Sequence, residues 1–240
     1  PGLGVLMLAA VLATVPLTAR AEETGAGAKK STAVGASSNW DAKVSSGDSV
    51  SGITLDQAQV AIIERVNRYF NDLDTLAGEF WQTDPEQKRS KGKFFLQRPG
   101  KFRFVYGAPS RLVILSDGET LSFEDKDVDS FDRYPIESTP FRVLLEPIVD
   151  LIKTATILDL YEGEELVVVT LQDRDDDSTG QMKIFFVVEG GELQLREWVI
   201  TGPQGGDTRV ELARVTRGEK LAADLFKLTP IIADLLNQRN

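Results

Sequence analysis

Apolar residues near the start of the folded region recur at steps of three and four, which is the period of an α-helix. They are Leu55, Ala58, Ile62, Val66, Tyr69 and Leu73. Thr54 and Gln57 have the spacing of a capping box, in which each side chain satisfies a free backbone N–H of the first turn. The pattern predicts a helix that begins near Thr54 and packs its apolar face against the rest of the protein.

From about residue 75 the apolar period shortens to two, which is typical of β-strands. The alternation identifies strands at 77–83, 90–98, 101–106, 111–115, 120–124, 166–171, 181–188, 193–201 and 208–215. Asp117 and Gly118 form a tight-hairpin signal, because glycine adopts positive φ without steric cost. Short connections make neighbouring strands antiparallel, and we expect about ten or eleven strands in all.

A strongly apolar segment interrupts the strand pattern at residues 139–152. Thr139 and Pro140 have the form of a helix start, with threonine as the N-cap and proline at the first helical position. The apolar residues of the predicted helix are Phe141, Val143, Leu144 and Leu145. Pro147 ends it. A large sheet needs a cover for its apolar concave side, and we expect the helix at 55–73 and this insert to supply that cover.

The first residues of the chain predict an export signal. Residues 2–19 are almost wholly apolar and uncharged, and residues 19–21 (Ala-Arg-Ala) have the small-x-small form of a cleavage site. A membrane anchor is the alternative, but Pro16 interrupts the apolar run. We therefore expect residues 1–21 to be a cleavable signal peptide and the mature protein to work in the periplasm. The basic residues and initiator Met that open such a signal are absent, so we expect its front to be truncated.

Composition divides the rest of the chain into three parts. Residues 22–52 are rich in Gly, Ala, Ser and Lys, and they carry too few apolar residues to offset the entropy of ordering. We therefore predict a flexible tether over 22–52, one folded domain over 53–232 and a C-terminal tail over 233–240.

The chain has no histidine and no cysteine. Their absence excludes Ser-His-Asp triads, thiol nucleophiles, disulfides and the usual zinc sites, so we predict no catalytic residue, no cofactor, no metal and no enzyme activity. The formal net charge of −10 argues against nucleic-acid binding, which needs a basic face. The acidic run at 173–177 resembles a calcium loop only superficially, and Asp125, Asp127 and Asp129 could bind a metal weakly. We predict a solvated hairpin turn at 173–177 and an exposed strand edge at Asp125, Asp127 and Asp129.

Five segments of the chain, in sequence order, resemble motifs of the outer-membrane lipoprotein carrier (LolA-like) family. They are Ala77–Gln82, Gly92–Tyr106 with its Arg-Pro and alternating aromatics, Val113–Leu121 with Ser-Asp-Gly, Ser138–Leu145 with Thr-Pro, and Leu225–Pro230. The resemblance runs from about residue 55 to residue 232. It implies an α+β, mainly β fold, in which an unclosed antiparallel β-barrel carries helices over a concave hydrophobic cavity.

The resemblance also implies a function and a site. Such a protein binds the acyl chains of lipoproteins, takes the lipoproteins from an inner-membrane ABC transporter and delivers them to an outer-membrane acceptor; we expect a monomer. Arg98 matches the arginine that latches the lid helix in this family, although an arginine at a strand end also commonly snorkels or pairs with a carboxylate. The implied acyl-chain cavity consists of Phe94, Leu96, Phe102, Phe104, Tyr106, Phe141, Leu144 and Leu145.

Two alternatives share this fold. A periplasmic sensor of mislocalised lipoproteins would carry a second domain, which we do not expect because the chain ends near the end of the carrier domain. A carrier of another lipid, such as a glycolipid or hopanoid, would show the same sequence pattern. An apolar cavity selects a lipid by the volume of its hydrocarbon chains and not by its headgroup.

Overall fold

The structure is a computed structural model that describes residues 52–139, 141–175 and 180–227. The predicted signal peptide and the predicted tail lie outside the described residues, as does the predicted tether apart from Gly52. In the described ranges, no helix is both long enough and apolar enough to cross a membrane.

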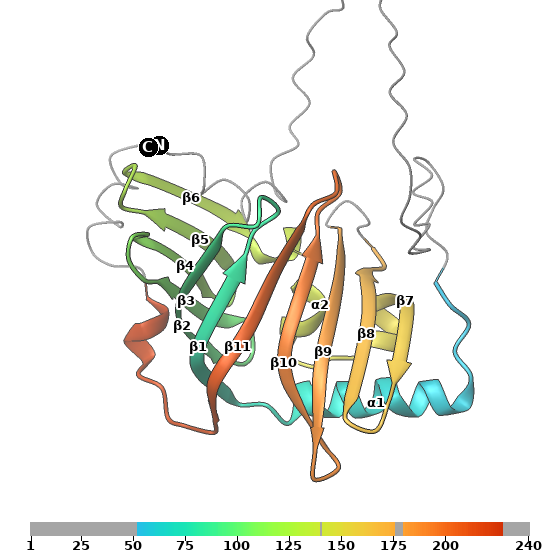
Figure 1. Cartoon of the computed structure of the whole chain (residues 1–240). Helices are drawn as coiled ribbons and strands as arrows, with labels where there is room; N and C mark the ends of the chain where they lie inside the picture. The colour runs from blue at the N-terminus through green and yellow to red at the C-terminus, as the bar shows by residue number, and fades with distance from the viewer. Residues whose placement is uncertain (1–51, 140, 176–179, 228–240) are drawn as a thin grey trace, which may run out of the picture. The chain divides into compact units, whose positions relative to one another are not determined.

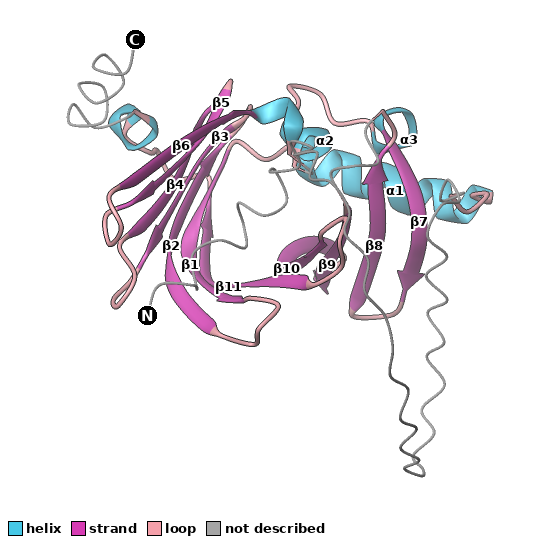
Figure 2. Ribbon diagram, turned by 90° about the horizontal axis from the view of Figure 1, so that it is seen from above, coloured by secondary structure: helices cyan, strands magenta, loops and turns pink. Residues whose placement is uncertain are grey.

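Eleven strands form one antiparallel sheet, which confirms the predicted fold class (Figure 1). The strands are β1 (Thr75–Thr83), β2 (Arg89–Gln97), β3 (Lys101–Tyr106), β4 (Leu112–Asp117), β5 (Thr120–Asp125), β6 (Ser130–Pro135), β7 (Ala155–Glu162), β8 (Leu166–Asp173), β9 (Gln181–Glu189), β10 (Glu192–Thr201) and β11 (Asp207–Arg217). Their spatial order is β6-β5-β4-β3-β2-β1-β11-β10-β9-β8-β7. Because β6 and β7 are the two edges and do not pair, the barrel stays open between them, and Figure 2 shows helices lying across that opening.

Two strands, β6 and β7, were missed by the alternation of apolar residues. Strand β6 lies at an edge, and none of its side chains is buried, so its sequence carries no apolar face. Strand β7 follows the short helix α3 (Leu151–Thr154) directly, without a turn between them. Its register against β8 shifts between Ile157 and Asp159, and this irregularity breaks the period of two.

Helix α1 (Gln57–Asn71) begins two residues later than predicted. The capping box is made by Asp56 and Gln59: the Asp56 carboxylate accepts from the Gln59 N–H at 2.8 Å, and the Gln59 side chain accepts from the Asp56 N–H at 2.9 Å. The prediction of Thr54 as the cap was wrong, because the backbone just before Thr54 is hydrogen-bonded to a strand of the sheet. The Ile53 N–H donates to the Ile157 carbonyl on β7 at 2.8 Å. The apolar stripe is buried as predicted from Ile62 onward, with Ile63 and Phe70 added to it.

The apolar insert forms two short helices, α2 (Arg142–Leu145) and α3. Thr139 does not cap α2, because its hydroxyl donates to the Ile136 carbonyl at 2.8 Å and so closes the 3-10 turn η1 (Ile136–Ser138). Pro140 lies outside the described residues. Helix α3 packs on α1, and α2 packs on α3, so the helices cover the concave side together, as predicted (Figure 2).

Gly92 on β2 provides the space in which two aromatic rings meet. It pairs with Phe80 on β1 and with Tyr106 on β3, and these two rings pack edge to face with centroids 5.0 Å apart. A Cβ at residue 92 would lie 2.7 Å from the Phe80 ring and closer still to the backbone carbonyl of Val105. A side chain at this position would therefore displace the core.

Gly92→Ala should lower the free energy of unfolding by about 2–3 kcal/mol, because overpacking a close-packed core forces side chains and backbone to shift. Gly107→Ala is the matched control, since a Cβ there would meet only the Lys91 carbonyl, at 3.4 Å. Urea unfolding of both variants measures the difference. Equal transition midpoints for the two variants would contradict the assigned role of Gly92.

Candidate functional site

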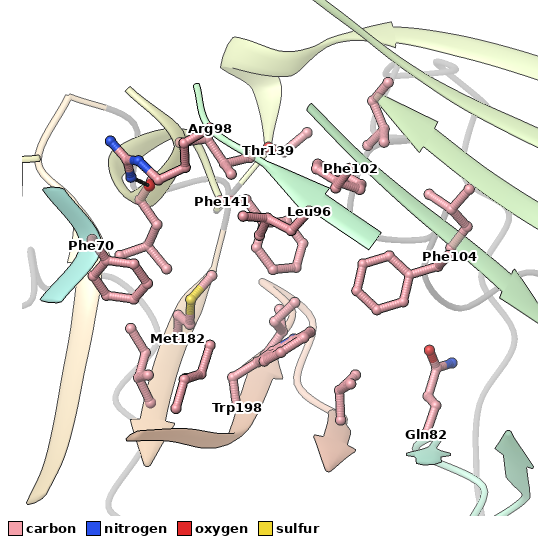
Figure 3. A pocket seen from close by; sticks show the side chains of 18 of the residues that line it. Phe70, Gln82, Leu96, Arg98, Phe102, Phe104, Thr139, Phe141, Met182 and Trp198 are labelled. Atoms are coloured by element: carbon pink, nitrogen blue, oxygen red, sulfur yellow. Dashed lines mark hydrogen bonds between the residues drawn. The ribbon is translucent and has the colours of Figure 1, made fainter. Parts of the chain in front are cut away.

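The concave face of the sheet lines an apolar cavity of about 100 Å³. Strands from both halves of the sheet line it, together with the end of α1 and the segment around α2, as Figure 3 shows. Its polar contributions are few: the side chains of Gln82, Arg98 and Thr139, with the ring polar groups of Tyr106 and Trp198. The cavity therefore suits hydrocarbon rather than a polar ligand.

Most of the predicted cavity residues lie on this cavity. They are Leu96, Phe102, Phe104, Tyr106, Phe141, Leu144 and Leu145, and Arg98 lies there too. Phe94 is the exception: it is buried but does not line the cavity. It pairs with Phe104 across β2 and β3, and its ring stacks on the Phe104 ring at 5.8 Å, so it supports that ring instead.

Sequence reasoning missed the lining residues at the C-terminal end of α1 and just after it, and those on strands other than β2 and β3. Those residues are Phe70, Leu73, Gln82, Ile114, Leu121, Phe123, Met182, Ile184, Leu195, Trp198, Ile200 and Val210. Most of them lie on predicted strands at alternating positions, which was a usable signal. Choosing which face points into the cavity needed the order and register of the strands, and the local sequence does not contain them.

Phe141 closes the cavity by contacting both halves of the sheet. Its ring lies 6.2 Å from that of Phe102 on β3 and 6.2 Å from that of Trp198 on β10, between centroids. Phe104 completes the cluster at 6.1 Å from Trp198. Figure 3 shows Phe141 lying among the labelled rings. We call residues 141–147, which carry Phe141 and α2, the lid.

Arg98, which directly follows β2, bonds to the backbone of the lid. Its Nη1 donates to the Leu144 carbonyl at 2.6 Å (Figure 3). Its Nη2 donates to the carbonyls of Glu146 at 2.5 Å and Pro147 at 3.3 Å. The last carbonyls of a helix have no hydrogen-bond partner within it, and the guanidinium of Arg98 donates to those of α2. Burial lowers the pKa of the Arg98 guanidinium, which still stays charged at neutral pH.

The two polar groups at the far end of the cavity satisfy each other. The Tyr106 hydroxyl donates to Oε1 of Gln82 at 2.5 Å. Burial raises the pKa of the Tyr106 phenol, so it stays neutral. This end of the cavity therefore carries no charge.

Each acidic run departs from its prediction at its first residue only: Asp175, Asp127 and Asp129 are exposed as predicted, and Asp176 and Asp177 lie outside the described residues. Asp173 ends β8 and is buried against Arg142, rather than solvated. Asp125 is also buried, and one of its oxygens accepts the Asp127 N–H to shape the turn between β5 and β6, so the exposed edge was wrong for this residue. Among the described residues, no cluster of acidic side chains could hold a metal ion.

The family model described as outer membrane lipoprotein carrier protein LolA matches residues 71–229, more than half of the chain. The chain belongs to this family. All the predicted site residues lie within the LolA match. An outer-membrane lipoprotein carrier protein from Methylococcus capsulatus is 28% identical over 183 residues, covering 72% of this chain and 86% of that protein. One from Dechloromonas aromatica is 26% identical over 182 residues, with 72% and 86% covered.

A solved LolA superfamily protein from Nitrosomonas europaea is 11% identical, with a TM-score of 0.41 over 70% of this chain and 97% of that one. Membership of the LolA family rests on the sequence matches.

Proposed function

We propose that this protein is a lipoprotein carrier, which binds the acyl chains of lipoproteins in the cavity under the lid. The apolar cavity, covered by a segment that side-chain and backbone hydrogen bonds hold in place, is the observation that carries the proposal. The names of the relatives support it, since they are called outer-membrane lipoprotein carrier proteins. The absence of histidine and cysteine agrees with a carrier rather than an enzyme.

The cavity under the lid is small compared with the size of an acyl chain. Pockets for small organic ligands usually measure about 300–1,000 Å³, and an apolar cavity of about 150 Å³ holds a molecule the size of benzene. The cavity here, at about 100 Å³, has no room for a long acyl chain. Binding must therefore move the lid and withdraw Phe141 from between the two halves of the sheet.

A carrier has to release its cargo, and the closed state provides the driving force. Each buried CH₂ contributes roughly 0.8 kcal/mol, so full burial of several acyl chains would exceed the practical limit of about 20 kcal/mol for noncovalent binding. Restoring the lid contacts and the aromatic cluster on closure opposes this gain. The closed state thus weakens the affinity of the carrier to a level at which cargo can leave.

The proposed route starts at the inner membrane, where an ABC transporter hands over the lipoprotein, and ends at an acceptor on the outer membrane. Residues 1–21 would direct export and be removed, residues 22–52 would form a tether, and the domain 53–232 would work as a monomer in the periplasm. Arg98 would be the latch that holds the lid, and the cavity aromatics would be the acyl-chain site.

Binding of a synthetic triacylated lipopeptide to the full chain tests the proposal, with native mass spectrometry as the readout. The same peptide without acyl chains is the matched control, and a glycolipid of equal chain length is the competitor. We expect only the acylated peptide to bind, in a ratio of about one to one. Preferential binding of the glycolipid would transfer the function to another lipid, and equal binding of both peptides would contradict the acyl-chain site.

A further inference from the structure

The lid is held on a second side, by an ion pair that Arg98 does not share. Arg142, the first residue of α2, donates from Nε to Oδ2 of Asp173 at 2.7 Å and from Nη2 to Oδ1 at 2.6 Å. The Asp173 side chain is 0% exposed, and that of Arg142 is 21% exposed. A bidentate pair of this kind fixes the orientation of both groups, and burial protects it from screening by salt.

The two attachments come from opposite halves of the sheet. Asp173 ends β8, whereas Arg98 follows β2, which is separated from β8 in the sheet by β1, β11, β10 and β9. Glu146 connects them, because its carboxylate accepts from Nη1 of Arg142 at 3.1 Å while its carbonyl accepts from Arg98. The lid therefore spans the cavity with one arginine at each side.

The chain beyond the lid is fastened to α1 instead. The amide of Asn71 donates to the Val149 carbonyl at 2.9 Å and accepts the Val149 N–H at 2.8 Å. Asn67 accepts the Leu151 N–H at 3.0 Å. Because these bonds are independent of both arginines, they can persist when the lid moves. The chain can therefore hinge at residue 148, between the lid and the anchored segment.

We propose that Arg142 and Asp173 form a second clasp on the lid, so that loading requires α2 to separate from β8 as well as from Arg98. Arg142 is on this account a positioning residue, since it acts on the lid and does not touch the cargo. The inference rests on the proposed function, because it concerns the motion that admits acyl chains.

The Arg142 guanidinium keeps its charge across the physiological pH range. The hydrogen bonds that Arg142 donates to Asp173 raise the pKa of the Arg142 guanidinium above its ordinary value, so this group stays charged. Asp175 also contacts Arg142, at 3.3 Å, but its side chain is 78% exposed. An exposed ion pair contributes little, so Asp175 provides a natural control for Asp173.

Hydrogen–deuterium exchange of the full chain tests the clasp without any ligand. The backbone N–H groups of Leu144, Leu145 and Glu146 donate to carbonyls within the lid, those of Phe141 and Arg142. A helix of four residues is not stable alone, so these amides exchange whenever the lid leaves the sheet. We expect Asp173→Asn to speed their exchange at least about tenfold, as hydrogen bonds to charged groups are strong. Exchange in α1 should stay unchanged, and Asp175→Asn should match the wild type.

A double-mutant cycle separates the clasp from a general loss of stability. Arg142→Gln should speed exchange of the lid as Asp173→Asn does, and the double variant should show no further increase, because both remove the same pair. Additive effects, equal effects of Asp173→Asn and Asp175→Asn, or faster exchange in α1 to the same degree would overturn the proposal. Failure of the wild type to bind lipopeptide would refute the proposed function. The exchange rates would still show whether Arg142 and Asp173 hold the lid.

Discussion

Phe102→Glu should reduce the affinity for a triacylated lipopeptide by at least about a hundredfold, because an ionised carboxylate in an apolar cavity has no partner. Phe102 is buried on the concave face of β3, and its ring contacts both Phe104 and the lid residue Phe141. The substitution therefore places a charge where acyl chains must lie. Titration with the lipopeptide, followed by native mass spectrometry, measures the loss.

Val105→Glu is the matched control for this substitution. Val105 lies on the same strand but on the opposite face, where its cross-strand neighbour is Lys93. The added carboxylate lies outside the cavity there and faces a cation, so the affinity should stay close to that of the wild type. Equal losses for Phe102→Glu and Val105→Glu would mean that the concave face is not the binding surface.

Arg98→Leu should tighten binding and slow release, since it removes three hydrogen bonds that hold the closed lid. Hydrogen bonds from a charged donor contribute about 1.5–3 kcal/mol, so the closed state loses on the order of that amount relative to the open one. The apparent dissociation constant falls as the open, binding-competent fraction rises, by roughly ten- to a hundredfold. Transfer of the lipopeptide to acceptor vesicles, followed over time, measures the slower release.

Arg103→Leu supplies the comparison for Arg98→Leu. Arg103 lies on the other face of β3 and donates to the Leu225 carbonyl at 3.1 Å, away from the lid. Its loss should leave both affinity and transfer rate unchanged. Release from Arg98→Leu at the wild-type rate would contradict the latch, even if the variant folds normally.

The fold could be predicted from patterns of residues that are close in the sequence. The errors arose where contacts with distant segments determine the local structure. Alternation identified nine strands because one face of each is buried. It missed β6, whose exposed edge carries no such contrast. The capping box was placed at Thr54 because Thr54–Gln57 and Asp56–Gln59 share the same spacing, and the structure forms the second pair while Ile53 bonds to β7.

In the candidate site, too, local patterns identified some residues, whereas residues that depend on distant segments were missed. Phe102, Phe104 and Tyr106 were found because they alternate on one strand and match a family motif. Trp198 was missed because its place opposite the lid depends on the order of β10 among the strands. The contact of Arg142 with Asp173, separated by 31 residues, has no signature in either segment.

Identification of the lipid that co-purifies with the exported protein from the periplasm tests the central claim most directly. The protein is released from the periplasm without detergent, and mass spectrometry of the bound material reports its chemical class. We predict triacylated lipoprotein in a ratio of about one to one, with the loss of bound lipoprotein in Phe102→Glu. A glycolipid or hopanoid in its place, or a protein that carries no lipid at all, would contradict the lipoprotein-carrier account.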